Sequence, residues 1–194
     1  MRDIAVLAAK EAGKILLLNL GKVKPDLKSK REFVTAADRL AEEKIYEIIK
    51  GTFPDHSILA EEFYNEDENS GYRWLVDPLD GTNNYVYSYP FFSVSIALEK
   101  DGEIVLGVVY DPLRDELFEA GKGERAKLNG REIVVTRTTK LKDSRLLTGF
   151  PYLMDKDNNL DNFVKFAIDA LEVRVDGSAA LDLCYVACGR ADGY

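Results

Sequence analysis

Carboxylates follow two short apolar segments at a spacing that could support metal and phosphate chemistry. Residues 74–86 read WLVDPLDGTNNYV, in which an apolar run leads into Asp77 and, three residues later, Asp80. A second apolar segment, residues 57–60, leads into Glu61. Hard divalent cations such as Mg²⁺ take carboxylate oxygens and keep several waters. Because strand ends commonly carry the functional groups of α/β and α+β proteins, we expect these acids to share one site.

The residues after the second aspartate have the composition of a phosphate seat. Gly81-Thr82-Asn83-Asn84 offers backbone N–H groups at the start of a short helix, and the Leu79 carbonyl between the aspartates is a neutral oxygen ligand. Asp-Pro and Asp-Gly pairs also form turns, so a polar turn is the competing interpretation. The order of the whole string favours the metal and phosphate site.

No Ser-His or Cys-His nucleophile is visible, which favours direct transfer of a phosphoryl group to water. The single histidine, His56, precedes an apolar segment and is expected to pack rather than to bind metal. Cys184 and Cys188 lie four apart, where a disulfide within one helix would be strained. We therefore expect both thiols to pack as small apolar groups in a reducing cytoplasm.

Charge and hydrophobicity exclude several classes of partner. The net charge of −8 over 194 residues disfavours nucleic-acid binding, which normally needs a basic face. The N-terminal segment carries Lys10, Glu11 and Lys14 between its apolar runs, so it fits neither a signal peptide nor a membrane span. The sequence predicts a cytoplasmic protein with no nucleic-acid or membrane partner.

Two helices and a run of strands are expected to position the acids. Apolar spacing predicts a helix over 3–20 and another over 35–50, with Thr35 as N-cap, Asp38 in the first turn and Gly51 at the end. Alone, Asp38 would be taken as an acid favoured by the helix dipole. The remaining elements are expected as strands at 57–60, 74–76, 92–98, 104–110, 116–120, 133–135, 146–148 and 172–175, with helices at 160–171 and 178–188 and a further strand beginning at 191.

The string WLVDPLDGTNNYV closely resembles the signature of the inositol monophosphatase superfamily of Mg²⁺-dependent, lithium-sensitive phosphatases. Three further blocks resemble family motifs in the family's order: VTAAD at 34–38, ILAEE at 58–62 and GSAA at 177–180. Ala60 stands where the second motif commonly has glycine. The blocks span almost the whole chain, so the resemblance is specific.

The resemblance implies an α+β fold, a layered α-β-α-β-α sandwich of the sugar phosphatase type. It implies one domain over 1–194 with two lobes: about 1–140 carries a mainly antiparallel sheet, and about 141–194 begins an α/β lobe. Family members continue past the equivalent of Tyr194 into a motif whose aspartate completes the second metal site. The C-terminal part of the fold is therefore expected to be missing.

The resemblance also implies two or three Mg²⁺ ions in the site. Glu61 and Asp77, with the Leu79 carbonyl, would hold the first ion, and Asp77 and Asp80 would hold the second. In this scheme one ion lowers the pKa of the attacking water and another stabilises the leaving alkoxide.

The resemblance gives further residues roles in catalysis and substrate binding. Thr82, oriented by Asp38, would help Glu61 position and deprotonate the water. The N–H groups of Gly81 and Thr82 would bind the phosphate. Arg174 would lie at the rim of the site or at a dimer contact, and the alcohol side would be lined by Gly177, Ser178 and Ala179.

The function implied is hydrolysis of inositol monophosphate, fructose-1,6-bisphosphate or both, by direct attack of a metal-activated water. Such an enzyme acts on small phosphorylated sugars or inositols of carbohydrate metabolism, and relatives are usually homodimers. One alternative is a 3′-phosphoadenosine nucleotide phosphatase of the same superfamily. The other is a catalytically silent, metal-binding remnant, if the chain truly ends at 194.

Overall fold

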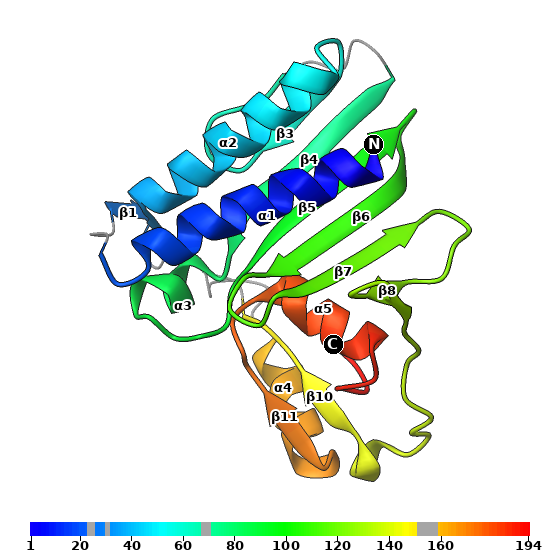
Figure 1. Cartoon of the computed structure of the whole chain (residues 1–194). Helices are drawn as coiled ribbons and strands as arrows, with labels where there is room; N and C mark the ends of the chain where they lie inside the picture. Colours follow the sequence, from blue (N-terminus) through cyan, green and yellow to red (C-terminus); the bar gives the residue numbers. More distant parts are fainter. Residues whose placement is uncertain (23–25, 30–31, 67–70, 151–158) are drawn as a thin grey trace.

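The computed structural model describes residues 1–22, 26–29, 32–66, 71–150 and 159–194. Its centre is a seven-stranded sheet of order β3-β4-β5-β6-β7-β8-β9 (Figure 1). Strands β3 and β4 are parallel, and every later neighbouring pair is antiparallel. The strands are β3 (Ser57–Ala60), β4 (Tyr72–Asp80), β5 (Ser93–Lys100), β6 (Glu103–Asp111), β7 (Glu116–Gly121), β8 (Lys127–Leu128) and β9 (Arg131–Glu132).

Two long helices, α1 (Arg2–Asn19) and α2 (Ala36–Thr52), lie side by side on one face of this sheet (Figure 1). Helix α1 buries a row of alanines, which lets the neighbouring backbone approach closely. The core between the helices and the sheet includes the fully buried Trp74, Ile45 and Leu16. Both helices were expected from the apolar spacing, and the structure confirms them.

Helix α2 begins with a reciprocal capping arrangement. The Thr35 hydroxyl accepts from the Ala37 N–H at 3.1 Å, and the Asp38 carboxylate accepts from the Thr35 N–H at 2.9 Å. This confirms the predicted N-cap. The predicted end at Gly51 is wrong, because the helix continues to Thr52 and the Phe53 N–H still donates to the Ile49 carbonyl.

Strand β4 is longer than expected and continues through Pro78 to Asp80. Its pairing with β5 shifts register between Asp77 and Asp80, so this segment is an irregular stretch of strand rather than the polar turn of the competing interpretation. A proline is tolerated at such a position because no regular ladder bond needs its missing N–H.

The other face of the sheet is covered by α5 (Ala179–Ala187). Leu181 of this helix packs against Phe91 and Phe118, whereas alternate residues of β6 such as Val108 face α1 and α2. Beyond α5 lies a second, two-stranded parallel sheet of β10 (Arg145–Leu147) and β11 (Glu172–Arg174).

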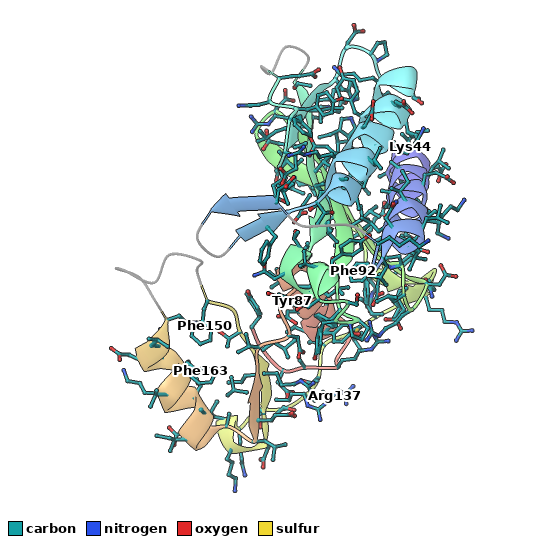
Figure 2. All side chains as sticks on the ribbon, turned by 90° about the vertical axis from the view of Figure 1, so that its left-hand side faces the viewer. Lys44, Tyr87, Phe92, Arg137, Phe150 and Phe163 are labelled. Atoms are coloured by element: carbon teal, nitrogen blue, oxygen red, sulfur yellow. The ribbon has the colours of Figure 1, made fainter. Side chains whose placement is uncertain are left out.

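Helix α4 (Leu160–Asp169) lies outside the second sheet, and its Phe163 points toward Phe150, with ring centroids 5.4 Å apart (Figure 2). The order helices, sheet, helix, sheet, helix is the α-β-α-β-α sandwich that the sequence predicted. The short elements are the hairpin of β1 (Asp26–Ser29) with β2 (Glu32–Val34), α3 (Thr82–Val86) and a 3₁₀ turn at Leu141–Asp143.

Two predicted strands near the second sheet have different outcomes. The strand predicted at 133–135 is wrong: the chain leaves the sheet after Glu132, and the side chains of Val134 and Val135 are 65% and 61% exposed. The extended segment predicted after 191 is confirmed as a bridge, in which the Gly193 carbonyl accepts from the Leu147 N–H at 2.8 Å. Within the described ranges, no helix has the length and apolar character needed to cross a membrane.

Candidate active site

A cavity of about 780 Å³ opens where β4, α3 and α5 meet. Four of its lining residues are acids, and the described residues that line it include no lysine, arginine or histidine. The cavity therefore concentrates negative charge without a basic side chain to offset it. The acids are Glu61, Asp77, Asp80 and Asp182.

Asp77 lies at the centre of this acidic group. Burial raises the pKa of its carboxyl group well above the ordinary range, and the neighbouring carboxylates of Glu61 and Asp80 raise it further. The Asp77 carboxyl group also forms a hydrogen bond with Glu61, while the Leu79 N–H donates to its Oδ1 at 3.0 Å. Acids held this close in a buried place need either a proton or a cation between them.

The donor set fits a hard divalent cation. Within the part of the chain that the structure describes, no three aspartate, glutamate, histidine or cysteine side chains form a complete metal-ligand cluster. Magnesium does not need one, because it usually takes one or two carboxylates and completes its shell with waters and substrate phosphate. Asp77 with Glu61 or Asp80, beside the Leu79 backbone, supplies such a partial set.

Asp80 joins the acidic group to helix α5. Its Oδ2 accepts from the Ser178 hydroxyl at 2.5 Å and from the Ala180 N–H at 2.8 Å. The pKa of Asp80 is raised overall, because burial raises it more than these hydrogen bonds lower it. Since Oδ2 is bound to the start of the helix, Oδ1 is the oxygen through which Asp80 would bind a ligand.

Thr82 and Asp38 lie close together, as the family resemblance implied. The Thr82 hydroxyl lies 2.9 Å from the Leu79 carbonyl and 3.3 Å from Oδ1 of Asp38. Asp38 is 2% exposed, and burial raises the pKa of its carboxyl group to about 6 although hydrogen bonds from Thr35 lower it. Two acceptors thus restrict the orientation of the Thr82 hydroxyl.

The predicted phosphate seat is a place that only glycine fits. Gly81 has φ of 95°, in the left-handed region, and it lines the cavity together with Thr82. A Cβ at Gly81 would lie 3.1 Å from the Phe91 carbonyl oxygen and 3.2 Å from that of Gly177. The chain therefore passes close to the opposite wall here, with its backbone exposed to the cavity.

The opposite wall consists of Gly177, Ser178 and Ala179, which all line the cavity as expected. Asn84 holds this wall in place: its Nδ2 donates to the Phe91 carbonyl at 2.7 Å and to the Asp176 carbonyl at 2.8 Å. The sequence-based predictions placed Asn84 in the phosphate seat through its backbone and gave its side chain no role. Its only signal was its place as the second of two asparagines just after Thr82.

Arg174 does not line this cavity. Its guanidinium pairs with Glu172 and Asp176 and faces a neighbouring cavity of about 390 Å³. The strand places Val175 and Gly177 toward the acidic cavity and Arg174 and Asp176 toward the other, as alternation along an extended segment requires. A role for Arg174 at the rim stays a prediction.

Asp182 is an acid of the cavity that the sequence-based predictions omitted. It is 1% exposed, and its Oδ1 has no hydrogen-bond partner among the described residues. Burial, together with the charges of Asp176 and Asp80, raises its pKa to about 7. The signal available was a lone acid inside the apolar run SAALDLCYVAC.

Comparison with known proteins gives concordant matches over the whole chain. The model of the inositol monophosphatase family matches residues 1–194. The Nus factor SuhB of Pasteurella multocida (strain Pm70) is 43% identical over 203 residues, which cover 100% of this chain and 75% of the relative.

Two further relatives carry enzyme names. The fructose-1,6-bisphosphatase/inositol-1-monophosphatase of Aquifex aeolicus (strain VF5) is 40% identical over 196 residues, covering 98% of this chain and 74% of the relative. The structure of inositol monophosphatase from Anabaena (Nostoc) sp. PCC 7120 superposes with a TM-score of 0.86 at 45% identity, covering 97% of this chain and 71% of that one.

Proposed function

The chain belongs to the inositol monophosphatase family, and from this premise we propose that it is a Mg²⁺-dependent phosphomonoesterase acting on inositol monophosphate, fructose-1,6-bisphosphate or both. The observation that carries the proposal is the composition of the cavity: four acids, with no basic side chain among the described lining residues, facing the glycine-threonine backbone. A phosphate monoester is itself an anion, so such a cavity suits it only when cations are bound.

The residues of the chain divide the work of hydrolysis. Glu61, Asp77 and Asp80 are proposed to bind the cations, with the Leu79 carbonyl as a neutral donor. Magnesium would supply charge neutralisation and a water of lowered pKa. The Gly81 and Thr82 backbone N–H groups bind the phosphate oxygens, and the restricted Thr82 hydroxyl orients the attacking water together with Glu61.

Direct attack by water is preferred over a covalent intermediate. Among the described residues that line the cavity, Thr82, Thr148, Ser178 and Tyr194 carry hydroxyl groups, and those of Thr82 and Ser178 contact Asp38 and Asp80 directly. The Ser178 hydroxyl donates to Asp80, and the described lining residues include no histidine or lysine that could act as its base. A serine without such a base is a poor nucleophile.

Three substrates distinguish the proposed activity from the alternative, a 3′-phosphoadenosine nucleotide phosphatase of the same superfamily. Release of inorganic phosphate is measured with inositol-1-phosphate, fructose-1,6-bisphosphate and 3′-phosphoadenosine 5′-phosphate, each with and without Mg²⁺. Turnover of either of the first two, abolished by chelation, supports the proposal. Turnover of the nucleotide alone assigns the alternative specificity, and no turnover of any substrate contradicts the phosphatase function.

A second candidate role comes from the relatives named Nus factor SuhB, one of which is 43% identical to this chain. A role of that kind need not use the acidic cavity. The variant Asp77→Asn separates the two, because it is expected to abolish phosphate release and to leave a non-catalytic role unchanged. If Asp77→Asn lost both phosphate release and the non-catalytic role, the second role would also depend on the cavity.

A further inference from the structure

Glu42 is a buried acid of helix α2 that lies outside the lining of the cavity and whose carboxylate binds backbone N–H groups. It is 1% exposed. Its Oε2 accepts from the Glu62 N–H at 2.9 Å, and its Oε1 accepts from the N–H groups of Phe63 and Tyr64 at 2.8 and 3.2 Å. A carboxylate that receives three successive backbone N–H groups binds that backbone tightly.

The three N–H groups belong to the turn that immediately follows Glu61. This turn closes on β3, because the Ala60 N–H donates to the Tyr64 carbonyl at 2.6 Å. The ring of Tyr64 also stacks on Tyr46 of α2, with centroids 3.9 Å apart. Helix α2 thus holds the turn at two points, the carboxylate of Glu42 and the ring of Tyr46.

Helix α2 also contacts Thr82, which together with Glu61 is proposed to orient the attacking water. Asp38, which contacts Thr82, lies four residues before Glu42 and on the same face of α2. Both acids lie on the same buried face of α2 as Ile45 and Ile49. Because these isoleucines pack in the core, the rotation of the helix about its axis is fixed. One rigid element therefore contacts the Thr82 side of the cavity through Asp38 and the Glu61 side through Glu42.

We infer that Glu42 is a positioning residue for Glu61: it ties the turn after β3 to helix α2 and so fixes Glu61 relative to Thr82. The inference rests on the proposed function, in which these two residues act on the attacking water. An error of about 1 Å in such a pair can cost about 100-fold in rate. A carboxylate is suited to this task because its two oxygens together accept hydrogen bonds from all three backbone N–H groups.

The test uses Glu42→Gln, which keeps the shape of the side chain but turns an NH₂ group toward a backbone N–H. We expect kcat to fall about 10- to 100-fold, the concentration of Mg²⁺ for half activation to rise, and KM to change less than about 3-fold. A second variant, Glu42→Asp, keeps the charge and withdraws both oxygens by one methylene. It is expected to give the same pattern.

Asp111→Asn is the matched control. Asp111 is also fully buried and also accepts from backbone N–H groups, those of Leu113 and Arg114, at 2.9 and 3.2 Å. It lies at the end of β6, away from the cavity lining, so its variant is expected to lose stability with little change in kcat. Equal losses of kcat in the Glu42 and Asp111 variants, or unfolding of both Glu42 variants, would overturn the inference.

A binding measurement separates this inference from the proposed function. Mn²⁺ affinity is measured by electron paramagnetic resonance for the wild type, Glu42→Gln and Asp111→Asn. We expect Glu42→Gln, and not Asp111→Asn, to raise the Kd for Mn²⁺ at least about 3-fold. This change corresponds to about 0.7 kcal/mol of binding free energy. A wild type that binds Mn²⁺ but hydrolyses no phosphate ester contradicts the proposed function only. Unchanged Mn²⁺ affinity in Glu42→Gln contradicts the positioning role.

Discussion

The carboxylate of Asp80 accepts a hydrogen bond from the hydroxyl of Ser178, 98 residues further along the chain, at a distance of 2.5 Å. The same oxygen accepts from the Ala180 N–H, so Asp80 caps helix α5, whose own N-cap residue makes no side-chain cap. One side chain therefore links the acidic end of β4 to the wall proposed to bind the alcohol part of the substrate.

Asp80→Asn is expected to reduce both activity and stability. Removing the charge takes away a proposed cation ligand, and we expect kcat to fall about 100-fold or more, as when one electrostatic group of an active site is removed. The weaker cap should lower the free energy of unfolding by about 1 kcal/mol. Phosphate release and urea unfolding measure the two effects. Full Mg²⁺-dependent activity in this variant would contradict the assignment of Asp80.

The hydroxyl of Thr82 is expected to matter more than its methyl group. Thr82→Ala removes the group held between Leu79 and Asp38, and we expect kcat to fall about 100-fold, a typical effect of a group that positions a proton transfer. Thr82→Ser restores the hydroxyl and should retain activity within about 10-fold. Steady-state kinetics compares the three proteins. Equal activity of the alanine and serine variants would mean that the hydroxyl has no part in the reaction.

Gly177 is expected to tolerate no side chain. It has φ of 87°, and a Cβ there would lie 2.9 Å from Nδ2 of Asn84. Gly177→Ala should therefore lower the free energy of unfolding by about 1–3 kcal/mol. Gly51→Ala is the control: it lies in the last turn of α2 with no atom within 4 Å of its Cβ position, so it should stabilise by about 0.4–1 kcal/mol. Urea unfolding measures the free energy of unfolding of both variants. Equal changes in the two variants would contradict the close packing of Gly177 against Asn84.

His56 is expected to make stability depend on pH. Its Nδ1 accepts from Nε1 of Trp74 at 3.1 Å, its ring stacks between Phe53 and Tyr72, and burial lowers its pKa below the ordinary value of 6.5. The unfolded chain then binds a proton that the folded chain does not. The stabilisation is complete above pH of about 6.5 and is lost as pH falls from there through the lowered pKa.

The variant His56→Phe keeps a ring in the stack but cannot titrate. Unfolding by urea at pH 8 and at pH 5.5 is compared for this variant and the wild type. We expect the wild type to lose more stability between the two pH values than the variant does. An identical loss in both proteins would show that His56 does not cause the pH dependence.

Most elements could be predicted because the apolar spacing agreed with the local signals, whereas the layered fold was implied by the family resemblance. The Asp101-Gly102 pair, for example, has φ of 50° and 81° and forms a tight hairpin between the segments predicted as strands at 92–98 and 104–110. The strand predicted at 133–135 was wrong because β9 ends at Glu132 and Val134 and Val135 then lie exposed, although their apolar side chains are typical of a strand. The division into two lobes near residue 140 stays a prediction.

The candidate site could be predicted where a motif is contiguous, and not where contacts cross the fold. Asp38 and Thr82 were expected together only through the family resemblance, and the structure places them 3.3 Å apart. The roles of the Asn84 side chain, of Asp182 and of Glu42 were not predicted, because they depend on contacts that only the fold brings together. An acid in line with buried apolar residues, as for Glu42 and Asp182, was the available signal.

The acids of the cavity are proposed to hold the cations that make phosphate hydrolysis possible. The most direct measurement is the initial rate of phosphate release from inositol-1-phosphate as a function of Mg²⁺ concentration, for the wild type and Asp77→Asn side by side. We predict a rate that rises with Mg²⁺ and vanishes on chelation in the wild type, and a rate at least about 1,000-fold lower at every Mg²⁺ concentration in the variant. A wild-type rate independent of Mg²⁺, or equal rates in the two proteins, would contradict the claim.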